Sequence, residues 1–127
     1  MKGYYSCLDI GCSDLVTQPI QHLVNGTMAE RLGGRVVFYT AEDPETLATQ
    51  LIIRDKIAEN EAIDGIIFFR LKQFAYGHGF NFRFLRELLE MGREVHFARE
   101  ALSLTSLADL ERTAETLLAY DHIQKAS

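Results

Sequence analysis

The sequence has too few cysteines for a disulfide framework, no apolar run long enough for a membrane span, and too little positive charge for a basic surface. Its two cysteines, Cys7 and Cys12, are not expected to pair in a cytoplasmic protein. Its longest apolar runs, such as AIDGIIFF, fall far short of the ~20 residues that cross a bilayer. A formal net charge of -5 argues against a nucleic-acid-binding protein, because such proteins usually carry a basic face.

Motifs that mark common enzyme families are also missing. The chain has no Walker loop, no G-x-G-x-x-G, no H-E-x-x-H and no G-x-S-x-G. The spacing of Cys7 and Cys12 is not that of a usual zinc pair. The first residues do not form a signal-peptide pattern. We therefore expect a cytoplasmic protein that uses no metal and no cofactor.

The length and the order of predicted elements favour one α/β domain over residues 1–127. A content of 47% hydrophobic and 24% charged residues is typical of a globular protein. Near-continuous apolar or aromatic runs predict strands that are buried on both faces. The predicted strands are residues 3–8, 35–40, 65–71 and 94–98. Helices are predicted at 18–32, from about 43, at 81–91, and after 105 or 106. This alternation predicts a three-layer fold with a four-stranded parallel sheet in the flavodoxin-like or resolvase-like order 2-1-3-4.

In such sheets ligands bind beyond the carboxyl ends of the strands. The first loop there carries Ser6 and Cys7, and the next helix begins with Gln18 and Gln21. Two amides in the first turn of a helix suit hydroxyls or a carboxylate. The alternatives are a buried, inert Cys7 and two ordinary surface glutamines.

Two glutamates follow strands directly and are candidates for acid/base chemistry. Glu42 follows the second predicted strand, and Glu100 follows the fourth. Two carboxylates at one mouth push their pKa values apart, which suits proton transfer. The alternative is a pair of solvated glutamates. Asp43 is most simply a helix cap, and His96 is expected to be a core histidine bonded to neighbouring backbone.

The segment FFRLKQFAYGHGFNFRF is long, aromatic and rich in glycine. Arg70 and Lys72 are predicted to alternate on a strand end and so to face opposite sides. His78 lies between two glycines, and the loop is a candidate lid over a ligand. The alternative is an oligomer contact through its aromatic side chains, which are Phe74, Tyr76 and Phe80.

Two family resemblances follow from these segments. GYYSCLD, the paired glutamines and FRLKQFAYG resemble the catalytic domain of serine recombinases of the resolvase type. Leu8 stands at that family's nucleophilic serine, and Ser6 stands at its arginine. The resemblance therefore implies the fold without recombination.

The second resemblance is to the sporadic carbohydrate cluster proteins, over roughly residues 3 to 100. It is carried in order by GYYSCLD, TQPIQHLV, YTAED, DGIIFFRLKQF and VHFARE. It implies a role in carbohydrate-derived or natural-product metabolism. The positions that match the family's pattern are Ser6, Gln18, Gln21, Glu42, His96 and Glu100.

We therefore predict a cofactor-independent enzyme, of isomerase or lyase type, that works as a homo-oligomer on a small polar molecule. The reaction would be an isomerisation, elimination or cyclisation by proton transfer. The predicted catalytic residues are Glu42, Glu100 and Ser6. The predicted substrate-binding residues are Gln18, Gln21, Arg70, Gln73, Cys7 and His78. The alternative is a non-catalytic, resolvase-like oligomerisation or ligand-binding module.

Overall fold

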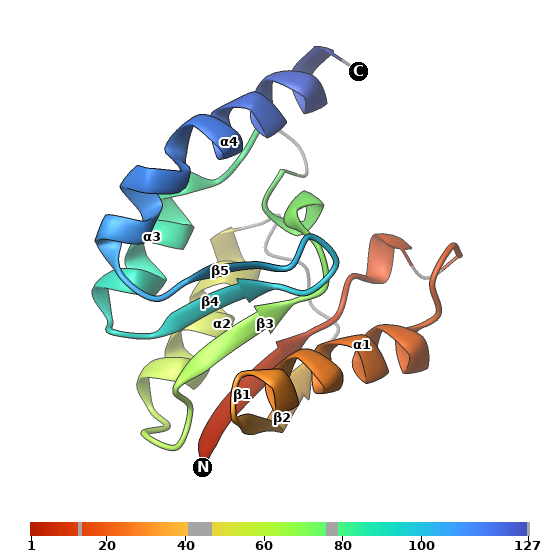
Figure 1. Ribbon diagram of the computed structural model, residues 1–127, viewed down its shortest axis with the longest axis vertical. Coiled ribbons are helices and arrows are strands. Elements are labelled where there is room, and N and C mark those ends of the chain that lie inside the picture. The colour runs from red at the N-terminus through yellow and green to blue at the C-terminus, as the bar shows by residue number, and fades with distance from the viewer. Residues whose placement is uncertain (13, 41–46, 76–78, 127) are drawn as a thin grey trace.

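The computed structural model of the chain describes residues 1–12, 14–40, 47–75 and 79–126 (Figure 1). Its strands are β1 (Lys2–Cys7), β2 (Gly34–Thr40), β3 (Gly65–Phe68), β4 (Glu94–Phe97) and β5 (Leu102–Leu104). Its α-helices are α1 (Gln18–Arg31), α2 (Leu47–Ala58), α3 (Phe82–Glu90) and α4 (Leu107–Ala126). Two short 3-10 helices are η1 (Ile10–Cys12) and η2 (Leu71–Phe74).

The strands form one sheet in the order β2-β1-β3-β4-β5. The first four strands are parallel and keep the predicted order 2-1-3-4, which is confirmed. The prediction of a four-stranded, wholly parallel sheet is wrong, because β5 pairs antiparallel with β4. A tight turn reverses the chain between these strands, and Ala101 lies in the left-handed region at φ 54°.

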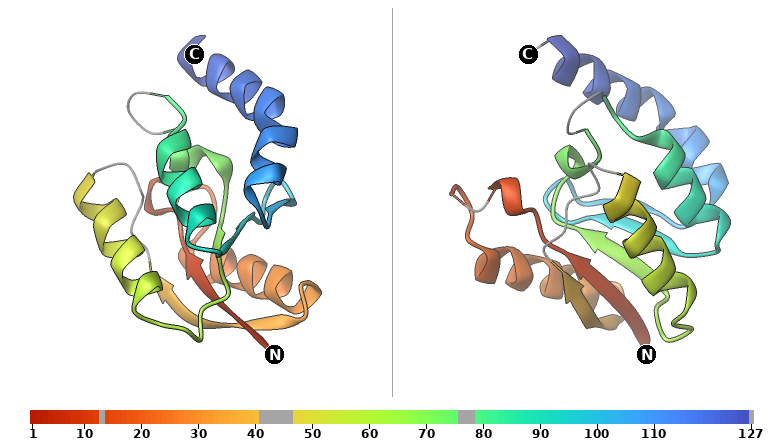
Figure 2. Two further views of the ribbon diagram at one scale, coloured as in Figure 1. Left: turned by 90° about the vertical axis from the view of Figure 1, so that its left-hand side faces the viewer. Right: turned by 180° about the vertical axis from the view of Figure 1, so that it is seen from behind.

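Helices cover the two faces of the sheet unequally (Figures 1 and 2). Helix α1 lies on one face beside β1, whereas α2 and α3 lie on the other and α4 packs against α3 and β5. The larger hydrophobic core fills the space under α2, α3 and α4, and a smaller one of Tyr4, Ala29 and Ile67 lies under α1. Helices therefore lie on both faces of the sheet, as the alternation of strands and helices predicts.

Helix α3 agrees closely with its predicted pattern. Its inward face consists of Phe84, Leu85, Leu88 and Leu89, and all four are buried. Each fully buried apolar side chain of this kind contributes about 1.5–3 kcal/mol. The Asn81 side chain caps the helix by accepting from the Phe84 N–H at 3.1 Å. The chain then leaves the helix at Gly92, whose φ is 76°.

Helix α1 turns a polar side toward the sheet. Its buried residues are Gln21, Asn25 and Ala29, whereas Ile20 is 52% exposed and Leu23 is 69% exposed. The polar side chains face inward because buried polar groups at the end of β1 need hydrogen-bond partners. Ile20 and Leu23 are consequently left toward the outside.

Tyr4 is fully buried and its ring lies against two glycines on the neighbouring strands. A Cβ atom at Gly34 would lie 2.7 Å from the ring, and one at Gly65 would lie 3.1 Å from it. A Gly65 Cβ would also come within 2.7 Å of the Glu94 Cβ. Glycine at these positions therefore gives the tyrosine room to lie flat along the sheet.

Strand β2 is an edge strand that carries a bulge. The register passes from Tyr4 opposite Val36 to Tyr5 opposite Phe38, which leaves Val37 as an extra residue.

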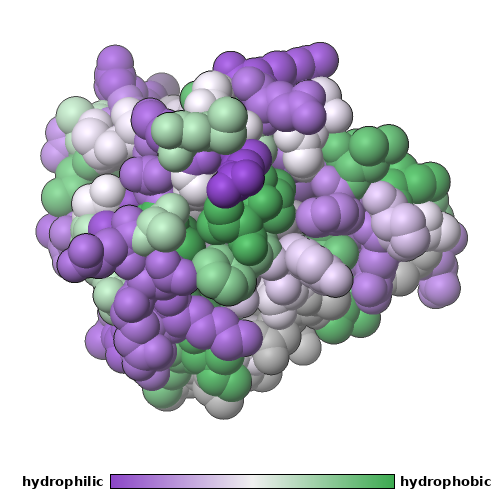
Figure 3. All heavy atoms as spheres, turned by 90° about the horizontal axis from the view of Figure 1, so that it is seen from below, coloured by the Kyte–Doolittle hydropathy of each residue, from purple (hydrophilic) through white to green (hydrophobic). Residues whose placement is uncertain are grey.

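On the face of the molecule drawn in Figure 3, hydrophobic residues lie in separate groups among hydrophilic ones. Among the described helices, none combines the length and the hydropathy needed to cross a bilayer.

Candidate functional site at the carboxyl ends of the strands

A buried ion pair joins the chain just after β1 to the chain just after β3. Asp9 is fully buried, and its Oδ2 accepts from the Arg70 Nε. The Arg70 side chain is only 12% exposed. Charged groups are almost never buried to this degree unless they are paired. The pair therefore fixes the relative positions of the two strand ends.

Gln21 holds the same segment through its backbone. Its Oε1 accepts from the Asp9 N–H at 2.6 Å. Its Nε2 donates to the carbonyls of Asp9 at 3.0 Å and Val16 at 2.8 Å. One fully buried amide thus satisfies three backbone groups in the loop between β1 and α1. Gln18, the other predicted glutamine, is exposed and takes no part in this network.

Gln73 makes a matching set of bonds from η2. Its Oε1 accepts from the Arg70 N–H at 3.0 Å, and its Nε2 donates to the Cys7 carbonyl at 3.2 Å. The Cys7 Sγ lies 3.7 Å from the same Nε2. Both Gln73 and Cys7 are fully buried. They therefore lie inside the protein beneath the carboxyl ends of β1 and β3, the edge of the sheet that we call the rim.

Glu100 reaches the same rim from the turn after β4. Its Oε1 accepts from the Leu71 N–H at 3.0 Å, at the start of η2. Much of the residue is exposed, but partial burial of its carboxyl group raises the pKa above the ordinary value. The hydrogen bond from Leu71 and the nearby charges of Arg99 and Arg70 oppose this rise. Glu100 is thus a solvent-accessible carboxyl group with an altered affinity for protons.

Ser6 lies deeper, inside the sheet layer. It is fully buried, and its Oγ accepts from the Asn25 Nδ2 at 2.9 Å. Asn25 also donates to the Ile67 carbonyl at 3.3 Å. The hydroxyl that we predicted to be catalytic therefore bonds to a protein amide and does not reach the surface. Cys12 is also buried, and both cysteines are free thiols.

The structure thus brings together Gln21, Arg70, Gln73, Cys7 and Glu100 around one strand edge. Glu42, Asp43, Tyr76 and His78 lie outside the described residues. The prediction that Arg70 and Lys72 alternate on a strand is wrong, because β3 ends at Phe68. The alternative of an oligomer contact is contradicted for Phe74 and Phe80, because these residues are 1% and 7% exposed.

Two residues of this network were not among the predicted site residues. Asp9 comes next after the strand that the sequence predicts at residues 3–8 and two residues after the end of β1, and this position is a signal that could have identified it. Asn25 lies one helical turn after Gln21, so the two amides share a face of α1. Polar side chains at this spacing in a helix that covers a sheet are a usable signal for a buried network.

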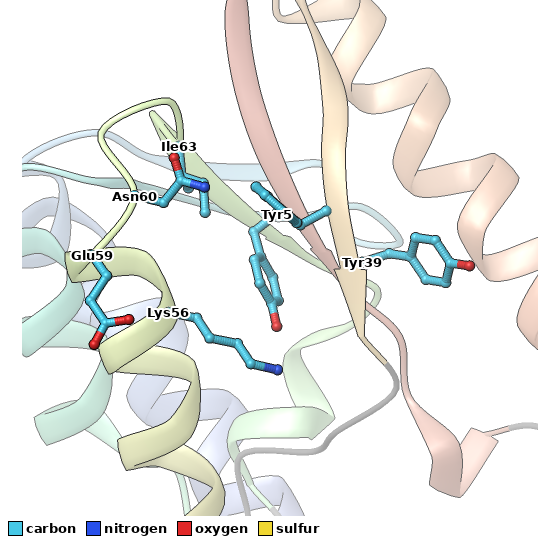
Figure 4. Close-up of a pocket in the computed structure, with 7 residues that line it drawn as sticks. Tyr5, Tyr39, Lys56, Glu59, Asn60 and Ile63 are labelled. Atoms are coloured by element: carbon cyan, nitrogen blue, oxygen red, sulfur yellow. The ribbon is translucent and has the colours of Figure 1, made fainter.

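A cavity of about 400 Å³ lies on the α2 side of β1 and β2 (Figure 4). In Figure 4 the Tyr5 hydroxyl and the Lys56 ammonium group point into the same space, and Tyr39 points away on the far side of β2. Neither Arg70 nor Glu100 lines this cavity. It is therefore separate from the rim.

His96 is buried, as predicted, but the hydrogen-bond partners of its imidazole ring are side chains and not the predicted backbone groups. Its two ring nitrogens contact the side chains of Glu94 and Ser103, at 2.8 Å and 2.7 Å. In the part of the chain that the structure describes, no three His, Cys, Asp or Glu side chains gather in a way that would hold a metal ion.

No protein-family model and no curated protein matches the chain. The two family resemblances therefore remain predictions.

Proposed function

We propose that the protein is a cofactor-independent enzyme that transfers a proton on a small polar molecule bound at the carboxyl ends of β1 and β3. One observation supports this proposal most directly. An unbroken set of contacts runs from Gln21 through Asp9 and Arg70 to Gln73, and Glu100 bonds to the residue next to Arg70. Residues far apart in the chain thus meet at one edge, where parallel sheets bind their ligands.

Glu100 is the acid/base group of this proposal. A raised pKa brings a carboxyl group closer to neutral pH, where a group that both takes and returns a proton works best. The Leu71 N–H fixes one of its oxygens at 3.0 Å. The other oxygen is then the one that would face a substrate.

Arg70 is the group that would position the substrate. Its guanidinium is held in place by Asp9, and its side chain keeps 12% of its surface exposed. A guanidinium fixed in this way favours a carboxylate or phosphate on the ligand. The proposed substrate class is therefore a small molecule that carries a carboxylate or a phosphate. Ser6, Gln21 and Gln73 would shape the site without touching the ligand.

Hydrogen exchange with solvent tests this function before the full reaction is known. The chain would be incubated in D₂O with a panel of sugar phosphates and hydroxy acids, and loss of carbon-bound proton signals would be followed by NMR. We expect exchange with at least one compound for the wild-type protein and for Glu111→Gln, a control on the exposed side of α4. Glu100→Gln should abolish it; exchange at the wild-type rate in that variant would remove Glu100 from the mechanism.

The alternative of a non-catalytic oligomerisation module has less support. Its predicted contact surface included Phe74 and Phe80, which pack in the larger core against each other with ring centroids 5.6 Å apart. We therefore retain the enzyme as the conclusion.

A further inference from the structure

A serine, a histidine and a glutamate lie in line on the face of the sheet that α1 leaves partly open. Ser103 on β5 stands opposite His96 on β4. The Ser103 Oγ lies 2.7 Å from the His96 Nδ1, and the His96 Nε2 lies 2.8 Å from the Glu94 Oε1. His96 is 1% exposed, whereas Ser103 is exposed. In Figure 1, α1 lies beside β1, and β4 and β5 face the viewer without a helix across them.

The hydrogen bonds around Glu94 determine which atoms donate and which accept among Glu94, His96 and Ser103. Its Oε1 accepts from the Tyr4 hydroxyl at 2.8 Å, and its Oε2 pairs with the Lys2 Nζ at 2.8 Å. An ionised carboxylate only accepts, so the His96 Nε2 must carry the proton of that contact. The Nδ1 of the neutral ring is then an acceptor, and the Ser103 hydroxyl donates to it.

The protonation states at neutral pH agree with that direction. Burial alone would raise the pKa of Glu94, but hydrogen bonds from Lys2, His96 and Tyr4 outweigh it and lower the pKa. Burial also lowers the pKa of His96 below its ordinary value, despite the neighbouring carboxylate. The histidine is therefore a neutral imidazole that is able to accept a proton, next to an ionised carboxylate.

An apolar groove of about 420 Å³ lies against the turn between β4 and β5, and its residues Ala98 and Ala101 are each two positions along the chain from His96 and Ser103. Ala98 and Ala101 form its floor at the turn between β4 and β5. Ala98 follows His96 by two residues and packs against the core that contains Tyr4, so the groove opens on the same face of the sheet. Its other wall is one side of α1 and the residue that follows the helix, and it consists of Leu23, Val24, Thr27, Met28, Arg31 and Leu32.

We propose that Ser103, His96 and Glu94 form a second active site that hydrolyses esters of apolar acyl groups, with the acyl chain lying in the α1 groove. Ser103 is the nucleophile, His96 the general base and Glu94 the group that orients the imidazole. This site shares no residue with the rim at the carboxyl ends of β1 and β3.

The reaction balances with water as the only co-reactant. The Ser103 Oγ attacks the ester carbonyl carbon while its proton passes to the His96 Nδ1. The carbon–oxygen bond to the leaving alcohol then breaks, and that alcohol takes the proton from Nδ1. Water attacks the acyl-serine in the same way, gives its proton to Nδ1, and releases the carboxylic acid as Ser103 regains its proton.

Burial and exposure distinguish this arrangement from a histidine that only supports the fold. A structural role explains a buried imidazole with two partners. It does not require that one partner be an exposed hydroxyl beside an apolar groove. The order of nucleophile, base and carboxylate is the one that activates serine on unrelated folds.

Ester hydrolysis by the full chain tests the proposal directly. We expect the wild-type protein to release p-nitrophenolate from p-nitrophenyl butyrate and to gain a fluorophosphonate adduct that peptide mass spectrometry locates at Ser103. Ser103→Ala should lose both, and Glu94→Gln should slow hydrolysis by about 100-fold or more. The control Ser106→Ala, at an exposed serine three residues away, should keep both. Hydrolysis by Ser103→Ala at the wild-type rate, or no adduct at Ser103, would overturn the proposal.

A thiol at the same position gives a second measurement that does not depend on the choice of ester. The native Cys7 and Cys12 are buried, so they contribute little to alkylation of the folded protein. We expect Ser103→Cys to react with iodoacetamide at pH 6.5 at least about tenfold faster than Ser106→Cys, because His96 would favour the thiolate. Equal rates would contradict the role of His96.

Discussion

The carboxylate of Asp9 and the guanidinium of Arg70 form a buried ion pair that links the first and third strands at their carboxyl ends. Neither residue lies in a strand, so the pair fixes two loops that the sheet itself does not hold. Asp9 is fully buried and Arg70 is largely buried, and the attraction between their charges offsets part of the cost of removing both from water.

Asp9→Asn should therefore destabilise the protein strongly. Loss of one partner leaves Arg70 charged and largely buried, which costs about 3–5 kcal/mol. The measurement is urea unfolding at pH 7. Asp55→Asn is the control, since the Asp55 side chain is 67% exposed in its ion pair with Arg54; it should change the free energy of unfolding by less than about 1 kcal/mol. If Asp9→Asn and Arg70→Gln were additive in the double variant, the pair would not be coupled.

Gln21 and Gln18 should differ sharply although they lie on the same turn of α1. Gln21→Ala removes three hydrogen bonds, one to the Asp9 N–H and two to the carbonyls of Asp9 and Val16. The Asp9 carbonyl keeps its bond from the Cys12 N–H at 3.2 Å. Unfolding should become easier by about 3 kcal/mol or more. Gln18→Ala changes an exposed side chain and should stay within about 0.5 kcal/mol of the wild type. Thermal and urea unfolding of the two variants would measure the difference, and similar losses would show that the loop does not depend on Gln21.

Gly65→Ala and Gly26→Ala compare a crowded glycine beside Tyr4 with a glycine in open space. Gly65→Ala would place its methyl group 2.7 Å from the Glu94 Cβ and 2.8 Å from the Glu94 carbonyl oxygen. The sheet must move to admit it, at a cost of at least about 2 kcal/mol. A Cβ atom at Gly26, inside α1, would meet nothing within 4 Å, so Gly26→Ala should stabilise by about 0.5–1 kcal/mol. Calorimetric melting would give both values, and a stable Gly65→Ala variant would show that the sheet around Tyr4 and Glu94 can shift to admit a methyl group.

His96 should make stability depend on pH between neutrality and acid. Its pKa in the folded protein lies below the ordinary value of 6.5, so the unfolded chain binds this proton more readily. Its contribution is fully present above pH 6.5 and falls as pH decreases through the folded pKa, by at most about 1.4 kcal/mol per pH unit. Urea unfolding between pH 7.5 and 5 would measure this slope. His96→Gln should have a smaller slope, and an unchanged one would mean that another group titrates.

The sequence predicted the parallel part of the sheet because β1, β3 and β4 have near-continuous apolar runs that only a two-sided core satisfies. Strand β5 was missed because three residues give no periodicity to detect. Its turn also depends on Ala101 at positive φ rather than on a glycine, so it carries no turn signal.

The sequence indicates which residues lie at the carboxyl-end edge of the sheet, but it does not indicate which of their side chains are buried. Strand ends and loops indicated Arg70, Gln73 and Glu100 correctly as residues of one edge. Whether a polar side chain faces a ligand or a buried backbone group depends on which face of α1 meets the sheet. The exposed Leu23 and the buried Gln21 show that apolar spacing alone does not decide this.

The bulge in β2 has a consequence for the behaviour of the protein at high concentration. Val37 and Phe38 are consecutive and both face the α2 side, while Tyr39 turns back toward His22, with ring centroids 5.0 Å apart. An edge strand whose alternation is broken in this way is a poor template for a strand from another molecule. Deletion of Val37 would restore a regular, weakly charged edge and with it a tendency to form fibrils.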